Sequence, residues 1–473
     1  MKRALILGMV ICMTLMAGIA WSADLYVPGD YSNIQSAINA AETGDTVLVA
    51  DGIYTGVGNK NIDFGGKALT VRSANGPGNC IIDCEGSGRG FYFYKGKGNP
   101  VVQGFTITGG VADNGGGIYC YSSSPTITNC TISGNSATNS TTNNGGGIYC
   151  YSSSPTITNC TISGNSADSG FGGGIYCESS STTITDCTIS GNSAFAGGGI
   201  FCYPGATIIT NCTINGNSVI YYGGGIFCGY SSPLITNCTI SGNRTDYSGG
   251  GIHHFGSDAT ITNSILWNDT PNEITFSENN PIVKYSDVQG GWVGEGNIDQ
   301  DPKFVSSNDY HLQKGSPCID AGTTAGAPPF DKEGNPRVGN PDMGAYEYQV
   351  DTTPPMMLLN DPSPSVLWPP NHKFVDVTIT GEVFDFCDPE LYIGVSVAVI
   401  DAEGRSGGPD YNLLEARIDA SGNIYILVSL RAERSGTNSG RTYEVTVTVT
   451  DDSGNSTSKA VQVIVPHDQG KKK

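Results

Sequence analysis

The sequence predicts an all-β protein in which a parallel β-helix with three strands per coil, begun by a short N-terminal capping helix, is followed by an antiparallel β-sandwich domain. The unit GGGIYCYSSSPTITNCTISGN begins at Gly115 and recurs unchanged at Gly145, and further Gly triplets begin at residues 172, 197, 223 and 249. A period of 25 to 30 residues indicates a solenoid. The runs of Ile, Thr, Cys and Tyr in each unit are too short for helices, so each unit is predicted to be a coil of strands.

Each coil is predicted to contain the strands GGGIYC, PTIT after the YSSS turn, and CTIS after a bend. A straight strand places alternate residues on opposite faces, so Ile127 and Cys130 both face inward only if the chain bends at Asn129. Gly, Asn and Asp tolerate positive φ best, which predicts a left-handed backbone at this bend. The residues aligned there are Gly104, Asn129, Asn159, Asp186, Asn211, Asn237 and Asn263.

Composition and periodicity divide the chain into six segments. NIQSAINAA has apolar residues at helical spacing, which predicts a short helix covering the first rung. VDTTPPMMLLNDPSP marks a domain boundary, and alternating runs such as FVDVTITGEVF beyond it predict antiparallel strands. The predicted segments are a signal peptide (1–23), a β-helix of about ten coils (24–304), its C-terminal cap (305–349), a Pro-rich linker (350–366), a sandwich (367–466) and a basic tail (467–473).

The N-terminus has the features of an export signal. MKRALILGMVICMTLMAGIAWSA combines a basic start, an apolar stretch too short to span a membrane and small residues before the expected cleavage, between Ala20 and Asp24. No second apolar run follows, so we expect a secreted or cell-surface-associated monomer without a transmembrane segment. The formal charge of −20 argues against nucleic acid as a partner.

Ten of the fifteen cysteines occupy two positions of the repeat. In-register parallel strands direct the Cβ atoms of neighbouring coils the same way, which suits a disulfide poorly. The sequence therefore favours stacked buried thiols that act as small hydrophobic residues, and disulfides between coils are the alternative in an exported protein. The registers are Cys120, Cys150, Cys177, Cys202 and Cys228, and Cys130, Cys160, Cys187, Cys212 and Cys238.

The segment IQSAINAAETGDTVLVADGIY, together with the coil pattern and its Asn bend, resembles the pectate-lyase-like right-handed parallel β-helix superfamily over residues 25 to about 300. The GGGI and SGN recurrences are similar to the polymorphic-outer-membrane-protein repeats of bacterial surface proteins. DYHLQKGSPCIDAG and DMGAYEY resemble the choice-of-anchor Q module, and the final domain is similar to bacterial immunoglobulin-like modules. The resemblance implies a right-handed β-helix. It implies no particular activity, because the superfamily contains enzymes and non-enzymes.

Aromatic residues alternate with the inward Ile and Cys residues of the first strand and are therefore predicted on its outer face. An exposed aromatic strip with a polar rim suits stacking on sugar rings. In the alternative interpretation, the rings only stabilise adjacent rungs through cross-strand contacts. The residues are Tyr119, Tyr149, Tyr176, Phe201 and Phe227, with Tyr121, Tyr151 and Tyr203 in a second row.

These patterns favour a non-catalytic exported protein that binds an extracellular polysaccharide or surface glycan, or mediates adhesion. The first alternative is a polysaccharide lyase or glycoside hydrolase. The resemblance implies that such enzymes use clustered Asp, or Ca²⁺ with an Arg or Lys base, on the face that is aromatic here. A His near carboxylates can transfer protons, so the residues considered for catalysis are His253, Arg244, Asp246 and Asp258. The second alternative is a structural or ice-binding surface protein, because Thr also recurs on outward positions.

Calcium is the one cofactor that the sequence suggests. Hard cations prefer clustered oxygen ligands, which two groups of acidic residues offer. Turns contain Asp and Asn for conformational reasons as well, so both groups are also explained without a metal. The groups are Asp299, Asp301 and Asp309, and Asp451, Asp452 and Asn455.

Overall fold

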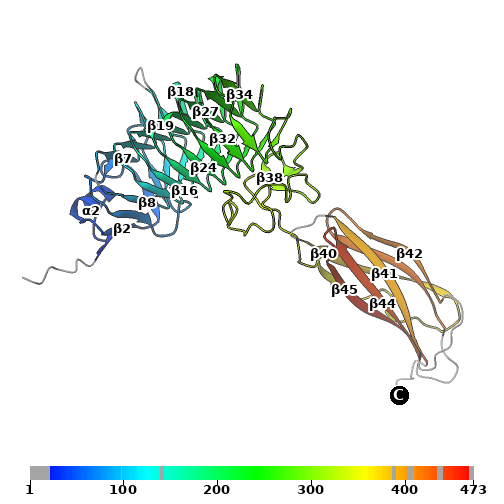
Figure 1. The fold of residues 1–473 in the computed structure, drawn as a ribbon. Coiled ribbons are helices and arrows are strands. Elements are labelled where there is room, and N and C mark those ends of the chain that lie inside the picture. Colours follow the sequence, from blue (N-terminus) through cyan, green and yellow to red (C-terminus); the bar gives the residue numbers. More distant parts are fainter. Residues whose placement is uncertain are drawn as a thin grey trace, which may run out of the picture. The chain divides into compact units, whose positions relative to one another are not determined.

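The computed structural model describes residues 22–96, 98–138, 143–256, 258–385, 390–401, 410–433 and 440–467. Most of the predicted signal peptide and of the basic tail therefore lies outside the described residues. The chain divides into two compact units after Tyr348. Unit 1 is a parallel β-helix and unit 2 consists of antiparallel sheets, so the predicted all-β fold class is confirmed (Figure 1).

Unit 1 stacks equivalent strands of successive coils into three long parallel sheets. Sheet A, which contains the PTIT segments, comprises β1 (Asp24–Val27), β2 (Thr46–Val49), β5 (Thr70–Ser73), β8 (Val101–Gln103), β12 (Thr126–Thr128), β16 (Thr156–Thr158), β20 (Thr183–Thr185), β24 (Ile208–Thr210), β28 (Leu234–Thr236), β32 (Thr260–Thr262) and β35 (Ile282–Lys284). Sheet B, which contains the CTIS segments, comprises β3 (Gly52–Tyr54), β6 (Cys80–Asp83), β9 (Thr106–Thr108), β13 (Thr131–Ser133), β17 (Thr161–Ser163), β21 (Thr188–Ser190), β25 (Thr213–Asn215), β29 (Thr239–Ser241), β33 (Ile265–Trp267) and β36 (Asp287–Val288). Sheet C, which contains the GGGIYC segments, comprises β4 (Ile62–Asp63), β7 (Phe91–Tyr94), β11 (Ile118–Tyr121), β15 (Ile148–Tyr151), β19 (Ile175–Ser180), β23 (Ile200–Gly205), β27 (Ile226–Gly229), β31 (Ile252–Phe255) and β34 (Ile274–Ser277).

The core of unit 1 follows from strand alternation and register. Ile118 pairs with Ile148, and Cys120 pairs with Cys150, between β11 and β15. All four side chains are fully buried, so each inner ladder stacks one residue type upon itself. The thirteen described cysteines are buried free thiols. Burial raises the pKa of Cys187 well above its usual range, which keeps such thiols uncharged in the core.

A fourth, short sheet adds a strand to the three predicted per coil. The residues after each SGN, for which no strand was predicted, are extended and pair between coils, as Ser136 with Ser166 and Ala137 with Ala167. The Ala residues face inward and pack in a small apolar cluster that includes Val219. Sheet D comprises β10 (Val111–Ala112), β14 (Ser136–Ala137), β18 (Ser166–Phe171), β22 (Ser193–Ala196), β26 (Ser218–Tyr222) and β30 (Arg244–Thr245).

The bend between sheets A and B has a left-handed backbone. Its Asn and Asp residues have φ values of 50 to 54°, and Gly104 has 81°. These residue types adopt this region at the lowest cost. The bend turns the chain between the two strands, so both present their apolar residues to the same core.

A second Asn ladder, which the sequence analysis missed, lies inside the coils. Asn165 is fully buried, and its Oδ1 accepts from the backbone N–H and the Nδ2 of Asn135 at 3.0 and 3.1 Å. Its Nδ2 donates to the Ile132 carbonyl at 2.9 Å and to Asn192 Oδ1 at 3.0 Å. The Asn of every SGN motif was a signal for this ladder, which comprises Asn135, Asn165, Asn192, Asn217 and Asn243.

Both ends of the β-helix are covered. Helix α2 (Ile34–Ala40) buries its apolar face against the first rungs, and Asn33 caps it by accepting a backbone N–H. At the other end Trp292 packs against the same core, and Val288 N–H donates to the Ile298 carbonyl at 3.0 Å. Residues between them, which the prediction included in the coils, therefore cover the last rung.

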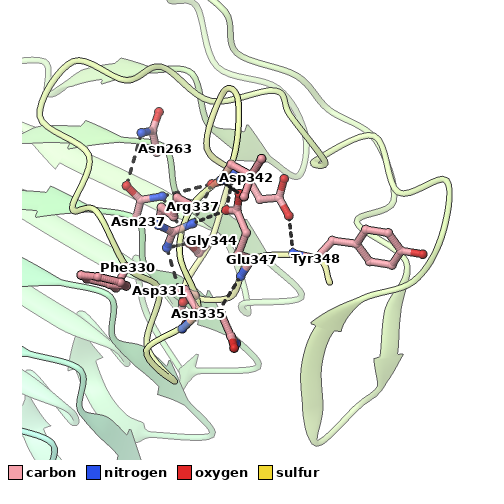
Figure 2. Close-up of polar contacts among 12 residues, drawn as sticks. Asn237, Asn263, Phe330, Asp331, Asn335, Arg337, Asp342, Gly344, Glu347 and Tyr348 are labelled. Carbon is pink, nitrogen blue, oxygen red and sulfur yellow. Dashed lines mark hydrogen bonds and ion pairs between the residues drawn. The ribbon is translucent and has the colours of Figure 1, made fainter. Parts of the chain in front are cut away.

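Residues 304–348 form a different segment, the covering segment, which packs along the outside of the coils. It begins with β37 (Phe304–Ser306) and β38 (Asp309–Leu312). Figure 2 shows it against the bend ladder. The Nδ2 groups of Asn211, Asn237 and Asn263 donate to its carbonyls at 2.9, 3.0 and 2.8 Å. The bend amides thus attach this segment to the side of the β-helix, whereas the sequence suggested a terminal cap.

A buried ion pair holds the covering segment together. Arg337 Nη1 lies 2.9 Å from Glu347 Oε2, and both side chains are 4% exposed. Arg337 Nη2 also donates to Asn211 Oδ1 at 3.0 Å. One guanidinium therefore joins the segment internally and to the coils.

Unit 2 has two antiparallel sheets that share one apolar core. Tyr443 is fully buried there, and its hydroxyl donates to the Arg431 carbonyl at 2.7 Å. One sheet comprises β39 (Met356–Leu359), β40 (Phe374–Phe384), β43 (Asn423–Arg431) and β42 (Tyr411–Ile418), and the other comprises β41 (Leu391–Asp401), β44 (Gly440–Asp451) and β45 (Ser456–Pro466).

Candidate functional site

The predicted aromatic strip forms a continuous stack on the outer face of sheet C. Successive ring centroids from Tyr119 through Tyr149, Tyr176 and Phe201 to Phe227 are 5.1, 5.2, 5.3 and 4.7 Å apart. Their interplanar angles lie between 2° and 15°. In-register pairing places each ring directly over its neighbour, so the ring faces contact one another. Tyr176 and Phe201 are buried, at 5% and 6% exposed, which corrects the prediction of an exposed strip at these two residues, whereas Tyr119, Tyr149 and Phe227 are half-buried.

The stack extends beyond the predicted residues. Tyr92 precedes it, with its ring centroid 5.2 Å from that of Tyr119, and the Arg89 guanidinium lies 4.9 Å from the Tyr119 centroid. The FYFY alternation of β7 was a signal for this extension. In the second row, Tyr121 and Tyr151 stack at 5.3 Å.

A groove of about 590 Å³ opens where the second row is interrupted. Its floor is the outer face of sheet C from β19 to β34, and its wall consists of sheet D residues. On the wall, Phe171 stacks on Phe201 with centroids 4.7 Å apart, and Tyr222 lies 4.5 Å from His253. The groove thereby provides ring surface from two directions.

The wall residues were missed because they lie between the SGN motif and the next Gly triplet, where no strand was predicted. An aromatic residue recurs one or two positions before four of the Gly triplets, in GFGGG, AFAGGG, YYGGG and YSGGG. That recurrence was the available signal. The aromatic wall residues are Phe171, Phe195 and Tyr222.

Gly229 produces the gap in the second row. It occupies the position that holds Tyr151 and Tyr203 in other coils. A Cβ at Gly229 would lie 2.7 Å from Tyr203 Cδ2 and 3.0 Å from Phe227 Cε1. Tyr203 therefore leans over this coil only because residue 229 has no side chain.

The two ionisable groups among the groove's polar residues are already engaged. Glu178 Oε2 accepts from the Tyr176 hydroxyl at 2.6 Å. His253 Nδ1 lies 2.8 Å from Thr275 Oγ1. Burial, followed by the neighbouring His254, lowers the pKa of His253 to about 4. His253 is therefore neutral at physiological pH.

The residues considered for catalysis lie in different places. His253 lines the groove, whereas Arg244 and Asp246 form an exposed ion pair of 3.3 Å beside a separate hollow of about 410 Å³. Asp258 Oδ1 accepts from Asn279 Nδ2 at 3.2 Å. His254 points inward and its Nε2 accepts from a backbone N–H. Sequence proximity did not become a shared site, because Arg244 belongs to β30 of sheet D, His253 belongs to β31 of sheet C, and Asp258 precedes β32 of sheet A.

The carboxylates considered for calcium do not gather as the sequence suggested. Asp299, Asp301 and Asp309 each accept a nearby backbone N–H, the ordinary role of Asp in turns. Among the described residues, the acidic group compact enough for a metal lies in unit 2. It comprises Asp351, Asp385 and Asp451, whose ligand atoms lie within 4.8 Å of one another.

Comparison with known proteins identifies the family. Residues 32–183, 67–234 and 173–297 match the model of the right handed beta helix region. The matches together span more than half of the chain, and the chain belongs to this family. A solved structure, the A-module of the mannuronan C-5 epimerase AlgE4 from Azotobacter vinelandii, aligns with 16% identity and a TM-score of 0.37, over 56% of this chain and 84% of that chain. No curated protein matches the chain.

The described part of the chain has no helix with the length and apolar character needed to cross a membrane.

Proposed function

We propose that this protein is exported and binds a glycan in the aromatic groove of unit 1 without cleaving it. The observation that carries the proposal is the groove itself, with about 590 Å³ of space lined by aromatic rings from sheets C and D. Aromatic rings provide large, rigid contact area for a partly apolar ligand. The groove crosses five strands of sheet C, which is roughly 19 Å at the usual rung spacing, long enough for an extended oligosaccharide.

Charge favours a neutral glycan over an acidic one. The groove residues include the carboxylate of Glu178 and the neutral His253, and none of the described residues that line it is Lys or Arg. The chain as a whole carries a formal charge of −20. A polyuronate would therefore approach a surface of its own sign without a compensating cation. We expect neutral oligosaccharides to bind and uronate oligomers to bind weakly.

The arrangement of polar groups supports binding without cleavage. Hydrolysis of a glycoside ordinarily uses two carboxyl groups on opposite sides of the bond, whereas the groove has Glu178, which already accepts from Tyr176. A neutral His253 held by Thr275 has no acidic partner in the groove. The polar groups therefore orient the aromatic rings.

The test is a glycan array followed by affinity measurement on the glycans that bind. Tyr203→Ala and Tyr230→Ala remove groove rings that are 39% and 51% exposed. Tyr94→Ala is the matched control, because it removes a ring that is 44% exposed outside the groove. Loss of one stacking ring should weaken binding about tenfold, the equivalent of about 1.4 kcal/mol.

Product analysis on the same glycans separates binding from catalysis. We expect no new reducing or unsaturated ends. Product formation that is lost in His253→Ala would overturn the proposal in favour of an enzyme. Absence of any glycan ligand, or equal weakening by Tyr94→Ala and Tyr203→Ala, would show that the groove is not a glycan site.

A further inference from the structure

The buried Asn ladder does not end on an amide. Its last member, Asn243, donates from its backbone N–H and its Nδ2 to Asp269 Oδ1, at 2.6 and 2.9 Å. Asp269 is therefore the next rung of the ladder, with a carboxyl group in place of the amide. Its side chain is buried, with 6% of the residue exposed.

Glu273 takes the place of the rung after that. The backbone N–H of Asp269 donates to Glu273 Oε1 at 3.0 Å, just as the N–H of Asn217 donates to Asn243 Oδ1 at 3.0 Å. Glu273 is also only 6% exposed. Asp269 Oδ2 and Glu273 Oε2 are both buried without a hydrogen-bond partner. The ladder thus ends in two adjacent carboxyl groups, each with one unsatisfied oxygen.

Asp269 Oδ2 occupies the position that the Nδ2 donor of Asn243 holds one coil earlier. A Cβ added to Gly225 would lie 3.1 Å from Asn243 Nδ2. A Cβ added to Gly251, the equivalent glycine of the next coil, would lie 2.5 Å from Asp269 Oδ2. Asn243 Nδ2 uses this position to donate to the Ile214 carbonyl at 2.9 Å. A carboxylate oxygen there would have no hydrogen to offer, whereas the O–H of a carboxylic acid restores the donor.

We propose that the Asp269–Glu273 pair keeps a proton at neutral pH and forms a proton-dependent latch that holds the last coil of the β-helix closed. The O–H of the pair donates where the ladder amides donate, to the in-register Ile240 carbonyl, or from one carboxyl group to the other. Loss of the proton leaves a buried charge facing acceptors, which is unfavourable and loosens the coil between β33 and β36.

The surroundings favour the neutral pair. Burial is the main cause that raises the pKa of both groups. The charge of Asp269 and a hydrogen bond with it raise the pKa of Glu273 next, and the field of Asp287 adds to this. The pKa of Asp287 is itself raised, first by burial and then by Asp299 and Asp301. On the covering segment, Tyr310 is the titratable group that faces Asp269.

Among the described residues, neither carboxyl forms an ion pair. Arg244 pairs with Thr270 through its backbone, yet its guanidinium is directed to the exposed Asp246 at 3.3 Å. A hollow of about 550 Å³ adjoins Asp269 and Glu273. Water in this hollow can receive the proton when the coil loosens.

The pH dependence has a definite sign. The folded pair binds more protons than the unfolded chain, in which Asp titrates near 3.8. Stability of the last coil is therefore complete at acidic pH and decreases as pH rises above that range. The decrease approaches tenfold in the opening equilibrium per pH unit for one proton lost.

Asp269→Asn tests the latch, because Asn occupies the five preceding rungs of the ladder and the variant should therefore fold. Hydrogen exchange of peptides covering 264–298, corrected for intrinsic rates, measures the opening equilibrium from about pH 5 to about pH 9. The opening equilibrium of the full-length protein should increase as pH rises. In D269N, the pH dependence of this equilibrium should be smaller by the contribution of one proton. Asp246→Asn, an exposed carboxyl in the preceding coil, is the matched control.

Infrared spectroscopy gives a readout independent of stability. At neutral pH we expect a protonated-carboxyl C=O band that D269N weakens and D246N leaves unchanged. A pH profile of D269N identical to that of the unsubstituted protein would overturn the proposal. So would the absence of the band, or greater opening of D269N at pH about 5, where the latch is proposed to be closed.

Discussion

Asn165→Ala tests whether the buried amide ladder holds the coils together. Alanine removes an acceptor for two donors of Asn135 and a donor to Ile132 and Asn192, four hydrogen bonds between 2.9 and 3.1 Å. At about 1 kcal/mol net for each buried bond, the free energy of unfolding should fall by about 4 kcal/mol. The unpaired donors and acceptors cannot reach water, because residue 165 is fully buried.

Thr161→Ala is the control in the same coil, because its side chain points outward and is exposed. Urea unfolding followed by circular dichroism gives the free energies, and hydrogen exchange shows whether neighbouring coils open first. The control should change stability by less than about 0.5 kcal/mol. A loss in Asn165→Ala no larger than that in Thr161→Ala would show that the ladder is not a source of stability.

Three further predictions concern buried groups. Burial raises the pKa of Cys84 to about 12, so it should not react with a thiol reagent at mildly alkaline pH until urea unfolds the protein. The other described thiols should be protected as well, because all of them are buried; rapid native labelling would contradict this. His253 should titrate near 4, so stability should fall as pH decreases from about 6.5 toward 4; a proton NMR titration midpoint near 6.5 would refute it. Arg337→Ala removes the ion-pair partner of the buried Glu347 carboxylate, and the free energy of unfolding in urea should fall by about 3–5 kcal/mol. The exposed Arg244→Ala should lower it by at most about 1 kcal/mol. Equal losses in the two variants would contradict this ranking.

Much of the architecture was predictable because its cause is local. The positions of Ile127, Cys130 and Asn129 within one unit were enough to infer strands, an inward face and a left-handed bend, and the structure has φ of 51° at Asn129. A repeat multiplies such local information, since each copy presents the same constraint to the chain. Asn165 belonged to the same motif, but its role depends on burial, which the motif alone did not indicate.

The candidate site was only half predictable for a different reason. The outward position of Tyr176 and Phe201 follows from alternation within a strand, so the strip was visible in the sequence. Phe171 contacts Phe201 across thirty residues, from a segment whose length varies between copies. Variable segments do not share a register from which a contact can be inferred, and the groove exists only where that segment meets the strip.

The repeat alone thus determined that this chain forms a β-helix with an Ile and Cys interior and an aromatic outer row. Packing decided what that row can offer. The rung spacing stacks the rings on one another, so binding surface remains only where Gly229 interrupts the second row and sheet D adds a wall. Packing also brought Asp269 and Glu273 together as a buried carboxyl pair at the last rung. Burial and register depend on contacts between coils, whereas strand alternation depends on one coil alone.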